Sequence, residues 1–231
     1  MNKVFKQQKG FTLIEIAIVL VIIGLLLGGV LKGQELINTA RVRALNNSVD
    51  GFTAAWFSFQ DRYRGFPGDY SQAAVNLPGG TTAAAANVGN GTVDTDEERA
   101  LVWQHLQQAG YITGSFDGTA ANATATEYGC NLATCPDNGF GAGMILSFGT
   151  LIRGGAGANA HELNAGLGVP VEVLAELDRK VDDGTAESGA MQLGAGGTSW
   201  AAAASDLCED GAGNYDIQNP SSNCAAVFRN F

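Results

Sequence analysis

The chain has 231 residues, enough for one or two domains, and a formal net charge of −10 at pH 7. Nucleic acid is therefore not expected as a partner, because phosphate binding requires a basic face. The sequence has no phosphate loop, nucleophile elbow or metal-binding histidine pair, so we do not expect an enzyme.

The N-terminal segment changes abruptly from basic to apolar. Lys3, Lys6 and Lys9 lie in a leader without acidic residues, and Glu15 is the single charged residue of the apolar run 11–31. A run of about 20 apolar residues is long enough to span a bilayer. We expect one membrane-spanning helix, which also anchors the precursor in lipid, followed by a water-soluble remainder.

The boundary between leader and apolar run has a specific motif. An ordinary secretory signal is cleaved after its apolar region, which here would discard the anchor. The sequence KGFTLIE, residues 9–15, instead resembles the type IV prepilin signal: basic leader, glycine, phenylalanine, then glutamate in register. This resemblance is close over residues 1 to about 65 and weak beyond. It implies that prepilin peptidase cleaves between Gly10 and Phe11 and then methylates the amine of Phe11.

The same resemblance implies a role for Glu15 in filament assembly. In that family, the glutamate pairs with the N-terminal amine of a neighbouring subunit during filament assembly. A carboxylate in hydrocarbon costs about 3 kcal/mol on insertion scales, and a buried α-amino group is also costly, so each charge relieves the other when they pair. In the free subunit, the alternative is that Glu15 reaches the headgroups.

The helical pattern continues beyond the membrane segment. Between Val42 and Tyr63 apolar residues recur every three or four positions, which predicts one apolar face of a helix, and Pro67 ends the pattern. We expect this face to pack on the head, whereas the few heptads and the aromatic residues make a coiled coil the less favoured alternative. Small residues that loosen a helix or permit close helix packing punctuate the apolar part: Gly24, Gly28, Gly29 and Gly33.

The head, residues 66–231, begins with a loop-like stretch over 66–95. Helices are predicted over 95–110, where Thr95 and Glu98 form a capping box, and over 169–184, with Pro170 in the first turn. In the second helix, Val171, Leu174, Leu177 and Val181 should face the core. Strands are expected over 142–152, 188–193 and 225–231, and residues 161–162 read as part of a Gly/Ala-rich loop.

All four cysteines lie beyond the apolar run. An even number in an exported head favours disulfides over zinc, since the spacings do not match a usual zinc pattern. Of the three possible connectivities we favour the local one, Cys130–Cys135 and Cys208–Cys224, which resembles the C-terminal disulfide loop of many pilins.

Two acidic clusters are weak candidates for calcium, and no other cofactor is expected. One comprises Asp94, Asp96 and Glu97, and the other comprises Asp182 and Asp183. Neither matches an EF-hand loop. The alternatives are that the first cluster favours a helix dipole and that the second is turn chemistry.

These features predict an α+β protein: a leader (1–10) that is removed, a long helix (11–65), and a head (66–231) of helices and a small antiparallel sheet. The resemblance implies a structural subunit of a type IV pilus-like filament in a bacterium. Its partners would be copies of itself or related pilins, prepilin peptidase and inner-membrane assembly machinery. The subunit would begin as a single-pass inner-membrane precursor and end in an extracellular or periplasmic filament. Alternatives are a pseudopilin of a type II secretion system and a membrane-anchored binding domain that does not polymerise.

The cleavage site gives the first testable prediction. The mature chain should begin at Phe11, with a methylated amine, because Gly10 precedes it behind the basic leader. Intact-mass measurement of the protein from membranes checks this. A chain that still begins at Met1, or one cut beyond Leu31, would contradict the prepilin interpretation.

Overall fold

The computed structural model describes residues 12–84, 88–119, 130, 132–152, 157–194, 208–229 and 231. The chain divides into two compact units, Met1–Arg41 and Val42–Phe231. The second is called the head unit below. Helix α1, Leu13–Tyr63, contributes residues to both.

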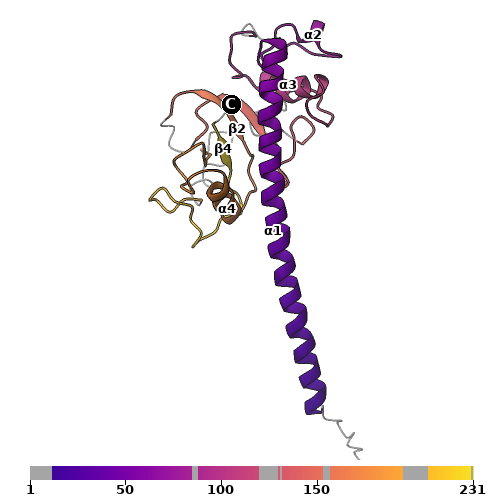
Figure 1. The fold of residues 1–231 in the computed structure, drawn as a ribbon, viewed down its shortest axis with the longest axis vertical. Coiled ribbons are helices and arrows are strands. Elements are labelled where there is room, and N and C mark those ends of the chain that lie inside the picture. The colour runs from indigo at the N-terminus through magenta and orange to yellow at the C-terminus, as the bar shows by residue number, and fades with distance from the viewer. Residues whose placement is uncertain are drawn as a thin grey trace, which may run out of the picture. The chain divides into compact units, whose positions relative to one another are not determined.

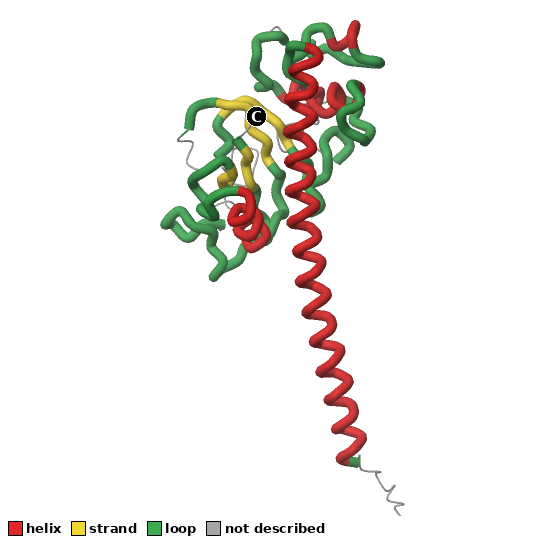
Figure 2. Tube along the Cα trace, viewed as in Figure 1, coloured by secondary structure: helices red, strands yellow, loops and turns green. Residues whose placement is uncertain are grey.

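The head unit combines helices with a small sheet (Figures 1 and 2). After α1 the elements are α2 (Ala73–Asn76), α3 (Asp96–Gln108), β1 (Ile145–Gly149), β2 (Ala160–Asn164), α4 (Val171–Val181), β3 (Met191–Leu193) and β4 (Ala226–Phe228). The strands form a four-stranded sheet in the order β1-β2-β4-β3, and all its pairs are antiparallel. The predicted α+β class, with a long N-terminal helix and an antiparallel sheet, is confirmed.

The apolar face predicted on the C-terminal part of α1 is buried in the head unit. Its buried members are Val42, Leu45, Val49, Trp56 and Phe59, and Phe52 and Tyr63 are partly buried against the same core. The aromatic residues join α1 to other elements: Phe52 lies 5.0 Å from Trp103 of α3, and Trp56 lies 5.0 Å from His161 of β2, between ring centroids. This face therefore serves packing within one chain rather than a coiled coil.

The helix-end signals of the sequence act as predicted in α3. Thr95 accepts a hydrogen bond from the backbone N–H of Glu98, whose side chain accepts one from the N–H of Thr95. The helix ends before Gly110, which has a φ of +79°. In α4, Pro170 is the N-cap rather than a first-turn residue, and Val171, Leu174 and Leu177 are buried.

Three further details of the sequence interpretation are wrong. Val181 is 45% exposed instead of facing the core, because α4 ends at that residue. Residues 161–162 lie in strand β2 rather than in a loop, and the short helix α2 interrupts the expected loop 66–95. Strand β2 has the sequence AHELN, in which polar and apolar residues do not alternate in the way that marks a strand with one buried face. Four of its five residues are nevertheless buried, because neighbouring elements cover them.

The structure contains two local disulfides, Cys130–Cys135 and Cys208–Cys224, which are the pairs favoured from the sequence. No cysteine is left free among the four, all of which the structure describes. The second bond closes a loop with a sequence separation of 16. In the chain-entropy model a loop of that size stabilises the fold by about 3 kcal/mol.

His105 of α3 is buried as a neutral imidazole. Its Nδ1 accepts a hydrogen bond from Gly68 N–H at 2.9 Å, so Nε2 carries the proton and donates to the Thr81 carbonyl at 2.7 Å. Burial lowers the pKa of His105 from 6.5 to about 4, although the Thr81 carbonyl opposes the shift. The ring thus fixes two loop segments to α3 only while it is uncharged.

His161 of β2 is buried among aromatic rings. Its ring centroid lies 4.6 Å from that of Phe66, 5.0 Å from that of Trp56 and 5.1 Å from that of Phe148. Its Nε2 is buried and has no hydrogen-bond partner in the described part of the chain. Burial lowers the pKa of His161 to about 4.

These histidines predict acid sensitivity of the head unit. Between pH 4 and 6.5 the unfolded chain binds more protons than the folded chain at each histidine, so stability falls as pH falls through this window. The loss is on the order of 3 kcal/mol per histidine. His161→Phe removes one titrating group from an aromatic site. Its melting temperature, followed by near-UV circular dichroism, should therefore drop less between pH 7 and 5 than that of wild type. Equal drops would contradict this origin of acid sensitivity.

Candidate functional site: the N-terminal segment and the acidic clusters

The predicted cation-binding residues of the first acidic cluster have separate protein partners. Asp96 pairs with Arg99 at 2.6 Å, Glu97 accepts a hydrogen bond from Ala84 N–H at 3.2 Å, and Asp94 accepts one from the Thr92 hydroxyl at 3.1 Å. Their carboxylates are not among the groups that converge on a common point in the described residues.

The second acidic cluster does converge, and it includes a residue that sequence reasoning missed. Asp178, Asp182 and Asp183 place carboxylate oxygens within 4.8 Å of one another. Burial raises the pKa of Asp178 to about 6, and the neighbouring charges of Asp183 and Asp182 add to the shift, whereas hydrogen bonds from Tyr215 and Gly184 oppose it. The four-residue spacing of Asp178 and Asp182 on a predicted helix was a signal for this proximity.

Helix α1 begins with a capping box made by Thr12 and Glu15. The backbone N–H and the hydroxyl of Thr12 donate to Glu15 Oε2 at 2.8 and 2.7 Å, and the N–H of Glu15 donates to the Thr12 hydroxyl at 3.3 Å. This reciprocal arrangement satisfies donors that the first helical turn leaves without partners. A carboxylate in the first turn also interacts favourably with the helix dipole.

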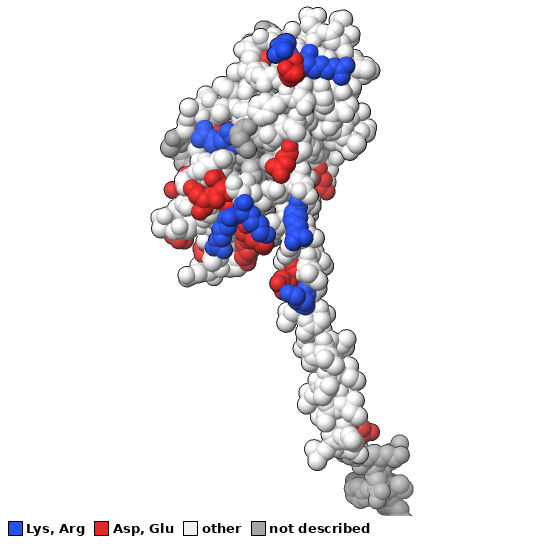
Figure 3. Space-filling model, viewed as in Figure 1, with Lys and Arg blue, Asp and Glu red and all other residues white. Residues whose placement is uncertain are grey.

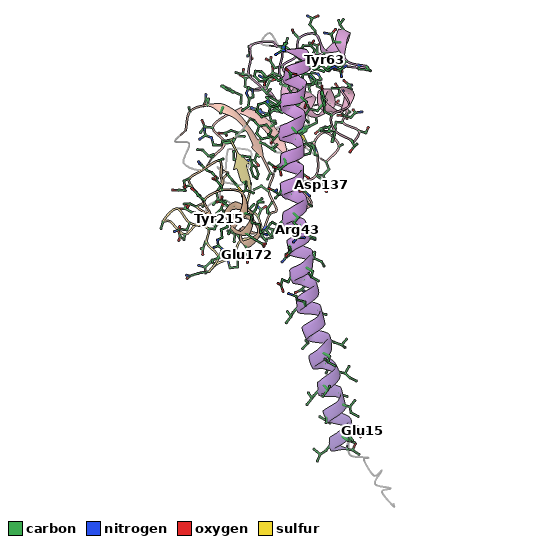
Figure 4. The ribbon with its side chains drawn as sticks, viewed as in Figure 1. Glu15, Arg43, Tyr63, Asp137, Glu172 and Tyr215 are labelled. Atoms are coloured by element: carbon green, nitrogen blue, oxygen red, sulfur yellow. A yellow bond between two sulfur atoms is a disulfide. The ribbon has the colours of Figure 1, made fainter. Side chains whose placement is uncertain are left out.

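The capping box uses one oxygen of the Glu15 carboxylate. Both hydrogen bonds from Thr12 end on Oε2, and in the described part of the chain Oε1 accepts none. Figure 4 shows Glu15 at the N-terminal end of α1. A carboxylate has about four acceptor positions, so Glu15 can accept a further cationic donor while it still caps the helix.

The stretch of α1 that follows Glu15 has an almost continuous apolar surface. Large apolar side chains between Leu13 and Leu31 are 46–93% exposed, and the next charged groups are Lys32 and Glu35, which form an ion pair at 2.6 Å. Figure 3 shows only uncharged side chains between these two places. By length and composition, α1 is the one helix in the described residues that is able to cross a membrane.

The glycines of this stretch are not required by packing within the chain. A Cβ added at Gly24, Gly28, Gly29 or Gly33 would have no heavy atom within 4 Å apart from the helix's own neighbouring backbone. Each glycine costs up to about 1 kcal/mol of helix stability relative to alanine. Among the described residues, no packing contact at these four positions offsets that cost.

A family model, the prokaryotic N-terminal methylation motif, matches residues 5–31. The chain carries a type IV pilin-like prepilin signal. This signal supports a pilin-like or pseudopilin-like protein, a structural rather than catalytic class, and together with the apolar helix it is consistent with a membrane-anchored precursor. No curated protein and no solved structure matches the chain.

The residues of the prepilin signal are only partly placed by the structure. Gly10 and Phe11 lie outside the described residues, whereas Thr12 and Glu15 are described and lie together. Sequence reasoning identified Glu15 from its register with the cleavage site but missed its contact with Thr12. The capping-box pattern, threonine followed three residues later by glutamate before an apolar run, was the signal for that contact.

The cap predicts a specific effect of replacing Thr12 in the prepilin signal. Thr12→Val keeps the side-chain shape but removes the hydroxyl, so the first turn of α1 should lose about 1 kcal/mol of local stability. Amide hydrogen exchange of residues 13–16 in detergent micelles should accelerate about fivefold. Thr12→Ser is the control and should exchange like wild type. Unchanged exchange in Thr12→Val would show that the hydroxyl does not hold the turn.

Proposed function

We propose that the mature chain is a structural subunit of a type IV pilus-like filament and that it polymerises through α1 after cleavage at Gly10. The observation that carries this proposal is the methylation motif over residues 5–31, with Glu15 in register behind the cleavage site. The mechanism is assembly rather than catalysis.

The exposed apolar surface of α1 supports assembly. Burying apolar surface gains roughly 25 cal/mol per Å², so this stretch requires an apolar environment at every stage. Lipid supplies it for the precursor, and the helices of neighbouring subunits supply it in a filament. The four glycines of the stretch, which no contact within the chain requires, let helix backbones approach closely.

The cap on Glu15 supports its proposed role in assembly. While the subunit is in the membrane, hydrogen bonds from Thr12 reduce the cost of the carboxylate in an apolar surrounding. On assembly, the free Oε1 accepts the cationic amine that cleavage creates on a neighbouring chain. The same residue thus stabilises the helix start and selects processed subunits, since an uncleaved chain has no amine at that place.

The proposal implies copies of this chain or related pilins, prepilin peptidase and inner-membrane assembly machinery as partners. It places the mature subunit in an extracellular or periplasmic filament. A pseudopilin of a type II secretion system shares the signal and the helix. Electron microscopy of filaments sheared from cells, with mass spectrometry of their subunits, separates a surface pilus from a short periplasmic one. A membrane-anchored binding domain is less favoured, because an ordinary anchor needs no processed N-terminus.

Replacing Glu15 tests the assembly mechanism. Glu15→Ala should leave membrane insertion and cleavage intact but reduce filament yield at least tenfold. The cause is an unpaired amine in the filament core, since removing one partner of a buried ion pair costs about 3–5 kcal/mol. Glu15→Gln keeps the shape without the charge and should also assemble poorly. Sheared filaments and membrane-bound mature subunit are measured side by side by immunoblot.

A control separates this effect from a general loss of charge. Glu35→Gln removes a carboxylate from α1 that is exposed and already paired with Lys32 within the same chain. It should assemble like wild type. Wild-type filament yield from a processed Glu15→Ala subunit would refute the pairing mechanism.

A further inference from the structure

Three carboxylates meet at the C-terminal end of α4. Asp178 lies in the last turns of the helix, and Asp182 and Asp183 follow it directly. Their ligand atoms lie within 4.8 Å of one another, and in the described chain no lysine or arginine forms an ion pair with any of them. Lys180, which is close in sequence, pairs with Glu176 instead. Such a concentration of like charge is unfavourable unless something neutralises it.

Asp178 is the critical member of this group because it is completely buried. Its Oδ2 accepts a hydrogen bond from the Tyr215 hydroxyl at 2.9 Å, and its Oδ1 is buried without a hydrogen bond of normal geometry, although the N–H of Gly184 lies nearby. Figure 4 shows Tyr215 beside α4. Buried carboxylate oxygens are normally satisfied by donors or by a metal ion. The Oδ1 of Asp178 is thus an unpaired, buried acceptor on a residue of the carboxylate cluster, which a cation could satisfy.

The other two carboxylates are held in place by the loop that follows α4. Asp182 Oδ2 accepts hydrogen bonds from the backbone N–H groups of Ala190 and Met191, which leaves Oδ1 without a partner in the described residues. Asp183 is fixed by the Thr185 N–H at 2.8 Å and the Ser188 hydroxyl at 2.5 Å. These bonds orient the carboxylates before any ligand arrives.

We propose that the Asp178, Asp182 and Asp183 carboxylates bind a calcium ion at the junction of α4 and the loop 182–190. Calcium binds oxygen ligands at about 2.3–2.6 Å, so oxygens on opposite sides of one ion lie up to about 5 Å apart. The observed spacing, within 4.8 Å, falls inside that limit. Magnesium, with bonds of about 2.0–2.1 Å, requires a tighter cluster. Asp183 is exposed, so water completes the coordination shell from the solvent side.

A bound ion would connect three segments of the head unit. Tyr215 belongs to the loop closed by Cys208–Cys224 and already donates to Asp178, and Ala186 N–H donates to the Gly213 carbonyl of the same loop at 3.1 Å. Calcium would therefore order the end of α4, the loop 182–190 and the disulfide loop together. This inference concerns the head unit alone and does not depend on whether the chain polymerises.

The competing explanation is a proton shared among the carboxylates in place of a metal ion. A protonated Asp178 would donate through Oδ1 to a neighbouring carboxylate and relieve the same repulsion. The two explanations differ in what Asp178→Asn does. With a shared proton, calcium has no effect on wild type, and the asparagine variant folds as well as wild type.

The test uses the full mature chain in detergent micelles after treatment with a chelator. Calcium chloride is titrated by calorimetry, and the melting of the head unit is followed by near-UV circular dichroism. Wild type should bind one calcium ion with a dissociation constant at or below about 1 mM, the range of extracellular sites, and its melting temperature should rise by about 5 °C at saturation. Magnesium should bind at least tenfold more weakly.

Two variants and a control complete the test. Asp178→Asn should weaken calcium binding at least tenfold, and Asp183→Asn, at an exposed position, should weaken it similarly. Glu176→Gln changes a carboxylate of α4 that pairs with Lys180 and should bind like wild type. The proposal is overturned by the absence of calcium heat and melting shift in wild type, by wild-type affinity in both aspartate variants, or by equal binding of magnesium and calcium.

Discussion

The exposed apolar surface of α1 is the constraint on which the rest of this protein depends. Between Leu13 and Leu31 the helix has large apolar side chains that water solvates poorly, and these side chains are exposed in the described part of the chain. The few polar features of this stretch are therefore informative. Thr12 and Glu15 form hydrogen bonds with each other that cap the first turn of the helix. The glycines stand at positions where a larger side chain would meet no neighbouring atom in the described residues. Beyond Val42 the same helix has a buried stripe, because there its own chain provides the cover.

The fold was predictable where the signal is local or periodic. The stripe from Val42 to Tyr63 and the capping box of Thr95 and Glu98 follow from spacing and backbone chemistry that act over a few residues. Strand β2 was not predictable in this way. Its histidine is buried because rings from α1 and from neighbouring loops surround it, and its glutamate is buried beside Arg229, which is distant in sequence. Only the assembled tertiary structure determines these environments.

The candidate sites also differ in how far the sequence predicts them. Glu15 was recognisable because a motif fixes its register, and Asp182 and Asp183 were visible as adjacent acids. The spacing of Asp178 from Asp182 indicated that the two lie close together, but the burial of Asp178 was not predictable, because an aspartate in a helix is usually exposed to solvent. The hydroxyl of Tyr215, which lies in a loop distant in sequence, donates a hydrogen bond to this buried carboxylate. Conversely, Asp94, Asp96 and Glu97 form a dense acidic stretch in the sequence, yet each has its own partner and they do not form a common site.

The placement of the disulfides has a mechanical consequence. Both bonds close local loops, and α1 contains no cysteine, so no covalent crosslink joins this helix to the remainder of the head unit. Tension applied along α1 reaches the sheet only through the peptide chain after Tyr63 and through side-chain packing, in which Trp56 and Phe59 have the largest buried rings of the helix. Under load these ring contacts, and no covalent crosslink, would resist separation of α1 from the rest of the head unit, while the two disulfides would hold their local loops closed.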